Sequence, residues 1–265
     1  MKLNLTKEES AHILNLRKEA VNVLCLQKNI APDQKARVSV VMDFSGSMSP
    51  LYRNGTVQAV LERLLPIAMQ FDDNGEMELW LFDDSFRRMP NITLQNYYGY
   101  VDKKILSKHY HMGCTEYAPI MKDVFDKYLV EEPDDIPNLV LFITDGANSD
   151  RPKSEKVIQA LSGYPIFWQF IGIGQHSFPF LEELDDLGDR VVDNANFFAL
   201  NDFQSIEDDK LYGRLLNEYP NWLGYPELKT MPYKSDHTMD EILNGSSASG
   251  NTPAKKKGFF SKLFS

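Results

Sequence analysis

Residues 37–50 read RVSVVMDFSGSMSP, a run of β-branched and apolar residues that ends in a short polar turn. The apolar part is typical of a buried strand. The turn supplies one acid, Asp43, and two hydroxyls at alternate positions, Ser45 and Ser47, while Gly46 permits a sharp bend. Carboxylate and hydroxyl oxygens suit hard cations such as Mg²⁺, Ca²⁺ and Mn²⁺. We therefore expect a divalent cation here, and the alternative is a polar turn that caps the following helix.

Outward from this turn, strand-like apolar runs alternate with helical segments along the chain. Several of these runs are apolar on both faces, which predicts an α/β fold with a mostly parallel central sheet and helices on both faces. Ligands of such sheets bind beyond the carboxyl ends of the strands, where the Asp43 turn falls. The strand patterns cover residues 37–44, 76–84, 138–146, 165–174 and 194–200, with residues 86–90 as a short additional candidate.

A cation bound at this turn needs further ligands, because three side chains from one loop are too few for six-coordinate binding. Other strand ends must supply them. Asp145 directly follows the run LVLFIT (139–144), and Thr115 lies in the segment HMGCTEYAP (111–119). The alternatives are a plain turn acid at Asp145 and a helix N-cap at Thr115.

Three motifs, in order along the chain, carry a resemblance to a known family. DFSGS (43–47), an isolated threonine before a helix at Thr115, and TDG (144–146) together resemble the metal-ion-dependent adhesion site (MIDAS) of von Willebrand factor A (vWA) domains. The resemblance implies a Rossmann-like vWA fold. Longer segments are similar to the bacterial vWA proteins associated with tellurite resistance (Ter-type), over roughly residues 5–225. These segments are LNLRKEA (14–20), LYRNGTVQAVLERLLPIAMQFDDNGEMELWLFD (51–83) and GCTEYAPIM (113–121).

The resemblance implies a role for each of five residues. Ser45, Ser47 and Thr115 would supply hydroxyl oxygens to a cation, and Asp43 and Asp145 would bind it directly or through water. One coordination position would stay open for a glutamate or aspartate of a protein partner. Mg²⁺ is the ion expected, with Mn²⁺ and Ca²⁺ as alternatives.

The implied function is a non-enzymatic protein-interaction module acting in a tellurite-resistance, stress-response or phage-defence assembly. Two alternatives stay open: a Mg²⁺-dependent phosphohydrolase, and a membrane-associated scaffold recruited by the C-terminal tail. Against the first, an aspartyl-phosphate hydrolase would have a second aspartate two residues after Asp43, where this chain has Ser45. Hydrolysis would also require a general base or a second metal, and the sequence offers no clear candidate for either.

Other polar residues near these motifs have open roles. Cys114 stands where the family more often has glycine, and a redox-sensitive thiol is the alternative to a plain loop residue. His109 and His111 would chelate a transition metal if they converge, although a solvated loop is the simpler interpretation. Asp83 and Asp84 follow a predicted strand, either as an auxiliary acidic site or as a solvated strand end.

The composition limits the classes of function. The chain has 265 residues and a formal net charge of −10, which argues against general binding to nucleic acid. Its two cysteines, Cys25 and Cys114, lack metal-ligand spacing and do not indicate a disulfide framework. No apolar run approaches the ~20 residues that span a bilayer, and no signal peptide is evident. We therefore expect a cytoplasmic protein, with peripheral attachment at the inner membrane face as a further option.

Four segments are expected along the chain. Residues 1–30 form an N-terminal extension with a helix that opens with a capping box. Residues 31–225 form the vWA domain, and residues 226–253 form a linker rich in Ser, Asn, Gly and Lys. Residues 254–265 form a flexible, basic and aromatic amphipathic tail, which would lie on an anionic membrane or dock into a groove of a partner.

Overall fold

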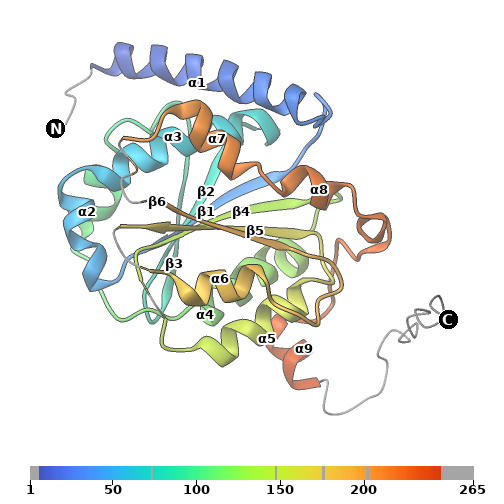
Figure 1. Ribbon diagram of the computed structural model, residues 1–265. Coiled ribbons are helices and arrows are strands. Elements are labelled where there is room, and N and C mark those ends of the chain that lie inside the picture. The colour runs from blue at the N-terminus through green and yellow to red at the C-terminus, as the bar shows by residue number, and fades with distance from the viewer. Residues whose placement is uncertain are drawn as a thin grey trace.

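A computed structural model of the chain describes residues 6–72, 74–146, 148–174, 177–200, 203 and 205–245. Within these residues, six strands form one sheet in the order β3-β2-β1-β4-β5-β6 (Figure 1). Neighbouring strands are parallel except β2 and β3, which are antiparallel, so the expected mostly parallel α/β sheet is confirmed. The strands are β1 Arg37–Asp43, β2 Met77–Phe82, β3 Phe86–Ile92, β4 Asn138–Thr144, β5 Ile166–Ile173 and β6 Ala195–Leu200.

Helices cover both faces of the sheet, and each face has its own apolar core, because strand side chains alternate between the two faces (Figure 1). One face is covered by α1 Lys7–Gln27, α2 Ser49–Arg53, α3 Thr56–Phe71, α7 Asp208–Leu215 and α8 Tyr219–Leu223. The other is covered by α4 Ala118–Phe125, α5 Arg151–Leu161, α6 Pro179–Asp185 and α9 Met239–Gly245. Short 3₁₀ segments lie at Gly46–Met48, Leu106–Lys108 and Pro226–Thr230, and π-helical segments lie at Val101–Ile105 and Asp126–Glu131.

β1 lies at the centre of the sheet and contributes side chains to both cores. Val40 and Met42 pack on one face, and Val41 packs on the other. β1 pairs with β2 on one side and β4 on the other, so its carboxyl end lies beside Phe82 and Ile143. The carboxyl ends of three parallel strands therefore meet at one edge, which is where the sequence predicts the cation site.

α1 forms an additional layer outside α3 and α7 (Figure 1). Its predicted capping box is confirmed, because the Thr6 backbone N–H donates to the Glu9 carboxylate at 2.7 Å and the Glu9 N–H donates to Thr6 Oγ1 at 3.2 Å. Asp208 of α7 accepts hydrogen bonds from Arg17 of α1 at 2.9 Å and from Arg63 of α3 at 2.7 Å. One carboxylate thus links the outer helix to the two helices beneath it.

The interpretation of residues 226–253 as a linker is wrong for the part that the structure describes. A 3₁₀ turn and α9 lie there, with Leu228 buried in the core on one face and Met239 buried in the core on the other. The sequence does carry local signals of α9: Met239, Ile242 and Leu243 have the i, i+3, i+4 spacing of a helix, and Thr238 and Glu241 form a capping box. The Ser-, Asn- and Gly-rich composition of the segment led to the linker interpretation instead. Residues 246–253 and the tail, residues 254–265, lie outside the described residues.

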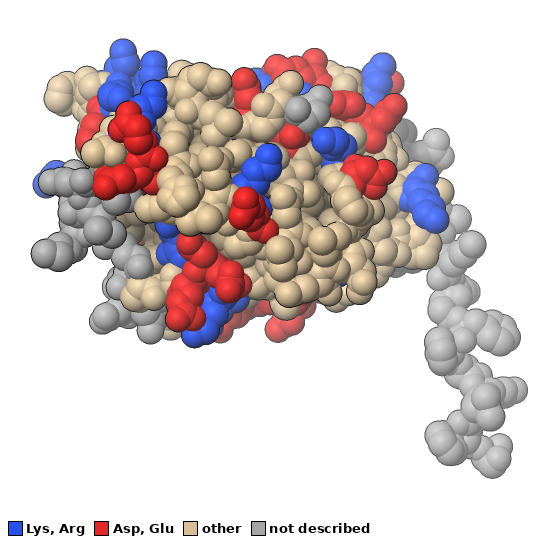
Figure 2. Space-filling model, turned by 90° about the horizontal axis from the view of Figure 1, so that it is seen from above, with Lys and Arg blue, Asp and Glu red and all other residues tan. Residues whose placement is uncertain are grey.

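The face that carries α1 has a mixed charge. Figure 2 shows Lys and Arg side chains interspersed with Asp and Glu on this face. Among the described helices, none combines the length and the apolar character needed to cross a bilayer.

We expect Met239→Ala to lower the free energy of unfolding by about 2–4 kcal/mol, because the side chain of Met239, the first residue of α9, is fully buried and its removal leaves a cavity. Urea denaturation followed by circular dichroism measures this change. Lys229→Ala is the matched control in the same segment, since Lys229 is exposed. Equal stability of the two variants would contradict the packing of α9 and restore the linker interpretation.

Candidate metal centre

Asp43 is the last residue of β1, and its carboxylate is fully buried. The backbone N–H of Ser45 donates to Asp43 Oδ1 at 2.7 Å, which closes the turn after the strand. The hydroxyl of Thr144, at the end of β4, donates to Asp43 Oδ2 at 2.6 Å. Tyr52 of α2 donates its phenolic O–H to the Asp43 carbonyl at 2.9 Å. The acid is therefore held by the turn after β1, by β4 and by α2, the helix labelled on the left of Figure 1.

The two serine hydroxyls connect this turn to the end of β4. Ser45 Oγ and Ser47 Oγ lie 3.1 Å apart, and the Ser47 hydroxyl donates to Asp145 Oδ1 at 2.9 Å. Ser45 is buried, Asp145 is half-buried and Ser47 is exposed. Hydrogen bonds thus join Asp43, Ser45, Ser47 and Asp145 into one set of oxygen atoms that reaches the surface.

Thr115 lies in a loop that contacts the Asp43 turn. The Gly46 N–H donates to the Gly113 carbonyl at 3.2 Å, which brings the two loops side by side. Thr115 is half-buried, and its carbonyl accepts a hydrogen bond from the Ser149 N–H at 2.9 Å. The structure therefore brings the loop of the fifth predicted residue to the site, although the chain of hydrogen bonds that joins the other four does not include Thr115.

The carboxylate that caps the helix after Thr115 belongs to Asp150, which the sequence pattern did not indicate. The N-cap of α4 is Tyr117, so the interpretation of Thr115 as the N-cap is wrong. The buried carboxylate of Asp150 accepts hydrogen bonds from the N–H groups of Tyr117 at 2.9 Å and Ala118 at 2.8 Å. Because Asp150 comes from the loop after β4, only the tertiary fold brings it to α4.

Burial raises the pKa of Asp43 to about 6, because a charged carboxylate is disfavoured away from water. Hydrogen bonds from Thr144 and Ser45 act in the opposite direction by stabilising the carboxylate, and the negative charge of Asp145 raises the pKa further. A cation close to Asp43 would favour the charged form and offset the cost of burying it.

The donor atoms at this edge fit a hard divalent cation. They are carboxylate and hydroxyl oxygens, the ligand types of Mg²⁺, Mn²⁺ and Ca²⁺. No group of three or more His, Cys, Asp or Glu side chains in the described part of the chain is arranged to hold a metal. A cation here would therefore depend on the hydroxyls of Ser45, Ser47 and Thr115 in addition to the two carboxylates.

The remaining polar residues near the site differ in their exposure. Cys114, His109 and His111 are exposed. Asp84 is also exposed, whereas Asp83 is buried, with a relative exposure of 2%. The expectation of a solvated strand end is therefore wrong for Asp83. The sequence distinguishes Asp83 only by the serine two residues later, Ser85, which stands in the same relation to it as Ser45 to Asp43.

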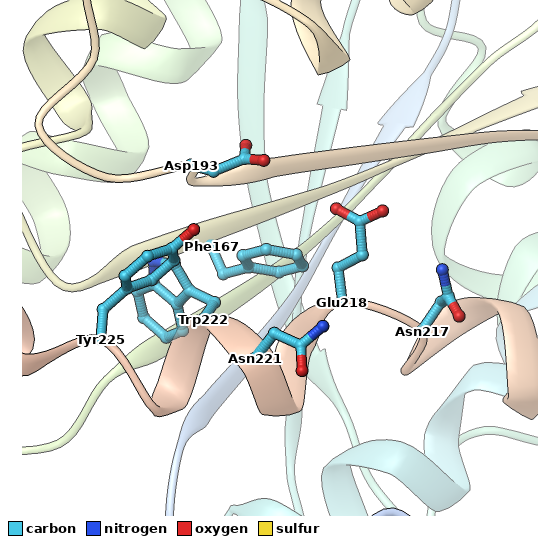
Figure 3. A pocket seen from close by; sticks show the side chains of 7 residues that line it. All are labelled: Phe167, Asp193, Asn217, Glu218, Asn221, Trp222 and Tyr225. Carbon is cyan, nitrogen blue, oxygen red and sulfur yellow. The ribbon is translucent and has the colours of Figure 1, made fainter. Parts of the chain in front are cut away.

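A cavity of about 310 Å³ lies at the opposite edge of the sheet, beside the amino end of β5 and α8. Figure 3 shows Asp193 on one side of it and side chains of residues 217–225 on the other. The Asp193 carboxylate is paired with Arg190 at 2.8 Å, and burial raises the pKa of Glu218. None of the five predicted residues lines this cavity. Its lining residues are Phe167, Asp193, Asn217, Glu218, Asn221, Trp222 and Tyr225.

Known proteins are similar to this chain over most of its length. A family model described as "vWA-TerF-like: vWA found in TerF C terminus" matches residues 35–230. The chain is also 41% identical over 254 residues to "Uncharacterized protein YcbR" of Bacillus subtilis (strain 168). That alignment covers 95% of this chain and 98% of the relative.

Solved structures with the same fold are more distant. Proximal thread matrix protein 1 (PTMP1) from the mussel byssus, with a zinc-occupied MIDAS motif, is similar with a TM-score of 0.52 and 17% identity. That similarity covers 74% of this chain and 51% of the mussel protein, about half of its length. The manganese-loaded TRAP protein of Plasmodium vivax is similar with a TM-score of 0.51 and 16% identity, covering 75% of each chain. At these identities the similarity shows the fold alone.

We expect Asp43→Asn to leave the metal-free protein as stable as the wild type at pH 7.5, or more stable by about 1–2 kcal/mol. The Asp43 carboxylate is ionised at this pH, and burial disfavours its charge only in the folded chain. Asparagine has nearly the same shape and retains an oxygen that can accept from the Ser45 N–H.

Urea denaturation in excess chelator tests this expectation, with Asp150→Asn as the comparison, because Asp150 caps α4 and has a structural role. A loss of more than about 1 kcal/mol in Asp43→Asn would show that the Asp43 charge stabilises the fold itself.

Proposed function

Because the chain belongs to the vWA-TerF-like family, we propose that it is a protein-interaction module that binds its partner through a divalent cation held by Asp43, Ser45, Ser47, Thr115 and Asp145. The observation that carries this proposal is the hydrogen-bonded set of oxygen atoms at the carboxyl ends of β1 and β4. Its surface end, at Ser47 and Asp145, is open to solvent and accessible to a second protein.

The balance of charge supports a role in binding. Asp43 and Asp145 together carry about two negative charges, which leave a bound dication close to neutral. A glutamate or aspartate of a partner would then complete the coordination sphere through a direct bond to the metal. The partner's carboxylate gains more from the metal than from water, because the site lies against buried protein rather than in bulk solvent.

Mg²⁺ is the ion we propose, because hydroxyl and carboxylate oxygens without nitrogen or sulfur ligands favour a hard cation. The mussel protein with its zinc-occupied MIDAS motif and the manganese-loaded TRAP protein share this fold and hold divalent cations, and their ions differ. We further propose that the module acts in a stress-response assembly of the kind associated with tellurite resistance or phage defence, which is the role implied by the family of similar bacterial proteins.

The proposal does not include catalysis. Hydrolysis at a metal of this kind requires a general base or a second metal to activate water. Ser45 occupies the position, two residues after Asp43, where an aspartyl-phosphate hydrolase would have its second aspartate. The alternative of a scaffold recruited by residues 254–265 depends on a segment outside the described residues.

We expect calorimetric titration with Mg²⁺ or Mn²⁺ to give one-to-one binding that is lost in Asp43→Asn and weakened about tenfold or more in Ser47→Ala. Both variants remove an oxygen ligand or its charge. Ser49→Ala is the matched control, because Ser49 lies in the same segment outside the set of hydrogen-bonded oxygen atoms. Full binding by Asp43→Asn would refute this assignment of the metal ligands.

We also expect the partner to bind only to the metal-loaded protein. Immobilised wild-type protein in Mg²⁺ should retain from cell extract a protein that neither chelator-treated wild type nor Asp43→Asn retains. Substituting one glutamate or aspartate of that partner by its amide should abolish retention. Retention that is equal with and without chelator would contradict a metal-mediated interaction.

A further inference from the structure

The end of β2 repeats the local geometry of the end of β1. Asp43 is the last residue of β1 and Asp83 directly follows β2, and each is followed two residues later by a serine. The Ser45 N–H donates to Asp43 Oδ1 at 2.7 Å, and the Ser85 N–H donates to Asp83 Oδ1 at 2.8 Å. Ser85 also donates its hydroxyl to the same oxygen at 2.8 Å. The turn after β2 therefore leaves the second oxygen of Asp83 available for another partner.

That second oxygen and the backbone of Asp83 hold the loop that carries Thr115. The Gly113 N–H donates to Asp83 Oδ2 at 3.2 Å, and the Glu116 N–H donates to the Asp83 carbonyl at 2.9 Å. These two hydrogen bonds lie on either side of Cys114 and Thr115. One residue at the end of β2 thus fixes both ends of the short segment that places the Thr115 hydroxyl.

The charge of Asp83 is paired within the protein. Asp83 Oδ2 lies 3.6 Å from Arg87 Nη1, and the Arg87 guanidinium lies over the ring of Tyr110, 5.2 Å from its centre. Asp83 is also buried, so its carboxylate does not line the exposed part of the site. A carboxylate that is paired with arginine and donors of the neighbouring loop supports a ligand rather than acting as one.

We infer that Asp83 is a positioning residue of the metal site, acting through the Gly113 and Glu116 amides to hold Thr115 where its hydroxyl reaches the cation. This inference rests on the proposed function. On the opposite side the loop is held by Ser149, whose N–H donates to the Thr115 carbonyl, so Asp83 supplies the restraint from β2 and Ser149 the restraint from β4.

Asp83→Asn tests the inference, because asparagine can still accept from Ser85 but presents an amide N–H₂ where the Gly113 N–H needs an acceptor. Asp84→Asn is the matched control, since it removes one negative charge from the adjacent, exposed residue. We expect Mn²⁺ affinity to fall about tenfold in Asp83→Asn and to change less than about twofold in Asp84→Asn. Equal losses of Mn²⁺ affinity in the two variants would show that only the removed negative charge matters, which would overturn the inference.

A double-mutant cycle with Thr115→Ala separates positioning from general destabilisation. If Asp83 acts through Thr115, Asp83→Asn weakens Mn²⁺ binding in the wild type and has little further effect once Thr115 is alanine. Fold-changes that multiply in the double variant would overturn the inference. Wild-type protein that binds no Mn²⁺ would overturn the proposed function together with this role, whereas wild-type binding with no difference between Asp83→Asn and Asp84→Asn overturns the role alone.

Amide hydrogen exchange of the metal-free wild type gives a second measurement that does not depend on the stability of a variant. The Gly113 and Glu116 amides should exchange much more slowly than unstructured amides, because both are hydrogen-bonded to Asp83. Exchange at the rate of an unstructured peptide would contradict the restraint.

Discussion

The buried carboxylate of Asp43 is the constraint on which the rest of the site depends. It ends the central strand in a place away from water. Because burial disfavours the charged form, it raises the pKa of Asp43. Hydrogen bonds from the Ser45 amide and the Thr144 hydroxyl satisfy both of its oxygens. They also shape the turn after β1 and join it to the end of β4. A buried acid in such a position has a cost that a bound cation offsets.

The loops around Asp43 are held in place by two buried aspartates, Asp83 and Asp150. Asp83 restrains the segment before α4 from the β2 side, and Asp150 accepts hydrogen bonds from the first amides of α4 from the β4 side. The end of β1, the end of β2 and the loop after β4 thus each contribute one aspartate, at 43, 83 and 150, to two different tasks. Asp43 faces the oxygen atoms proposed to bind the cation, while the other two fix the backbone that presents Thr115. Metal sites commonly depend on such supporting groups for the orientation of their ligands.

Much of the fold could be predicted from sequence because its strands are continuous apolar runs between turn signals, as in β1, β4 and β5. The grouping of Asp43, Ser45 and Ser47 was also local, since three alternate residues in one turn can be recognised without a structure. The supporting residues could not be recognised in this way. Asp150 reaches α4 only through the tertiary fold, and Asp83 is marked in the sequence only by the serine two residues later. The capping box and the apolar spacing of α9 are local signals of a helix, but the core that receives Met239 is formed by residues far away in the chain.

The most direct test of the central claim is a crystal structure of the protein soaked in Mn²⁺, with anomalous diffraction measured at the manganese edge. Our account predicts one anomalous peak at the carboxyl ends of β1 and β4, about 2.0–2.4 Å from the hydroxyl oxygens of Ser45 and Ser47 and with one coordination position open to solvent. A peak elsewhere, or none at a saturating concentration of Mn²⁺, would contradict it.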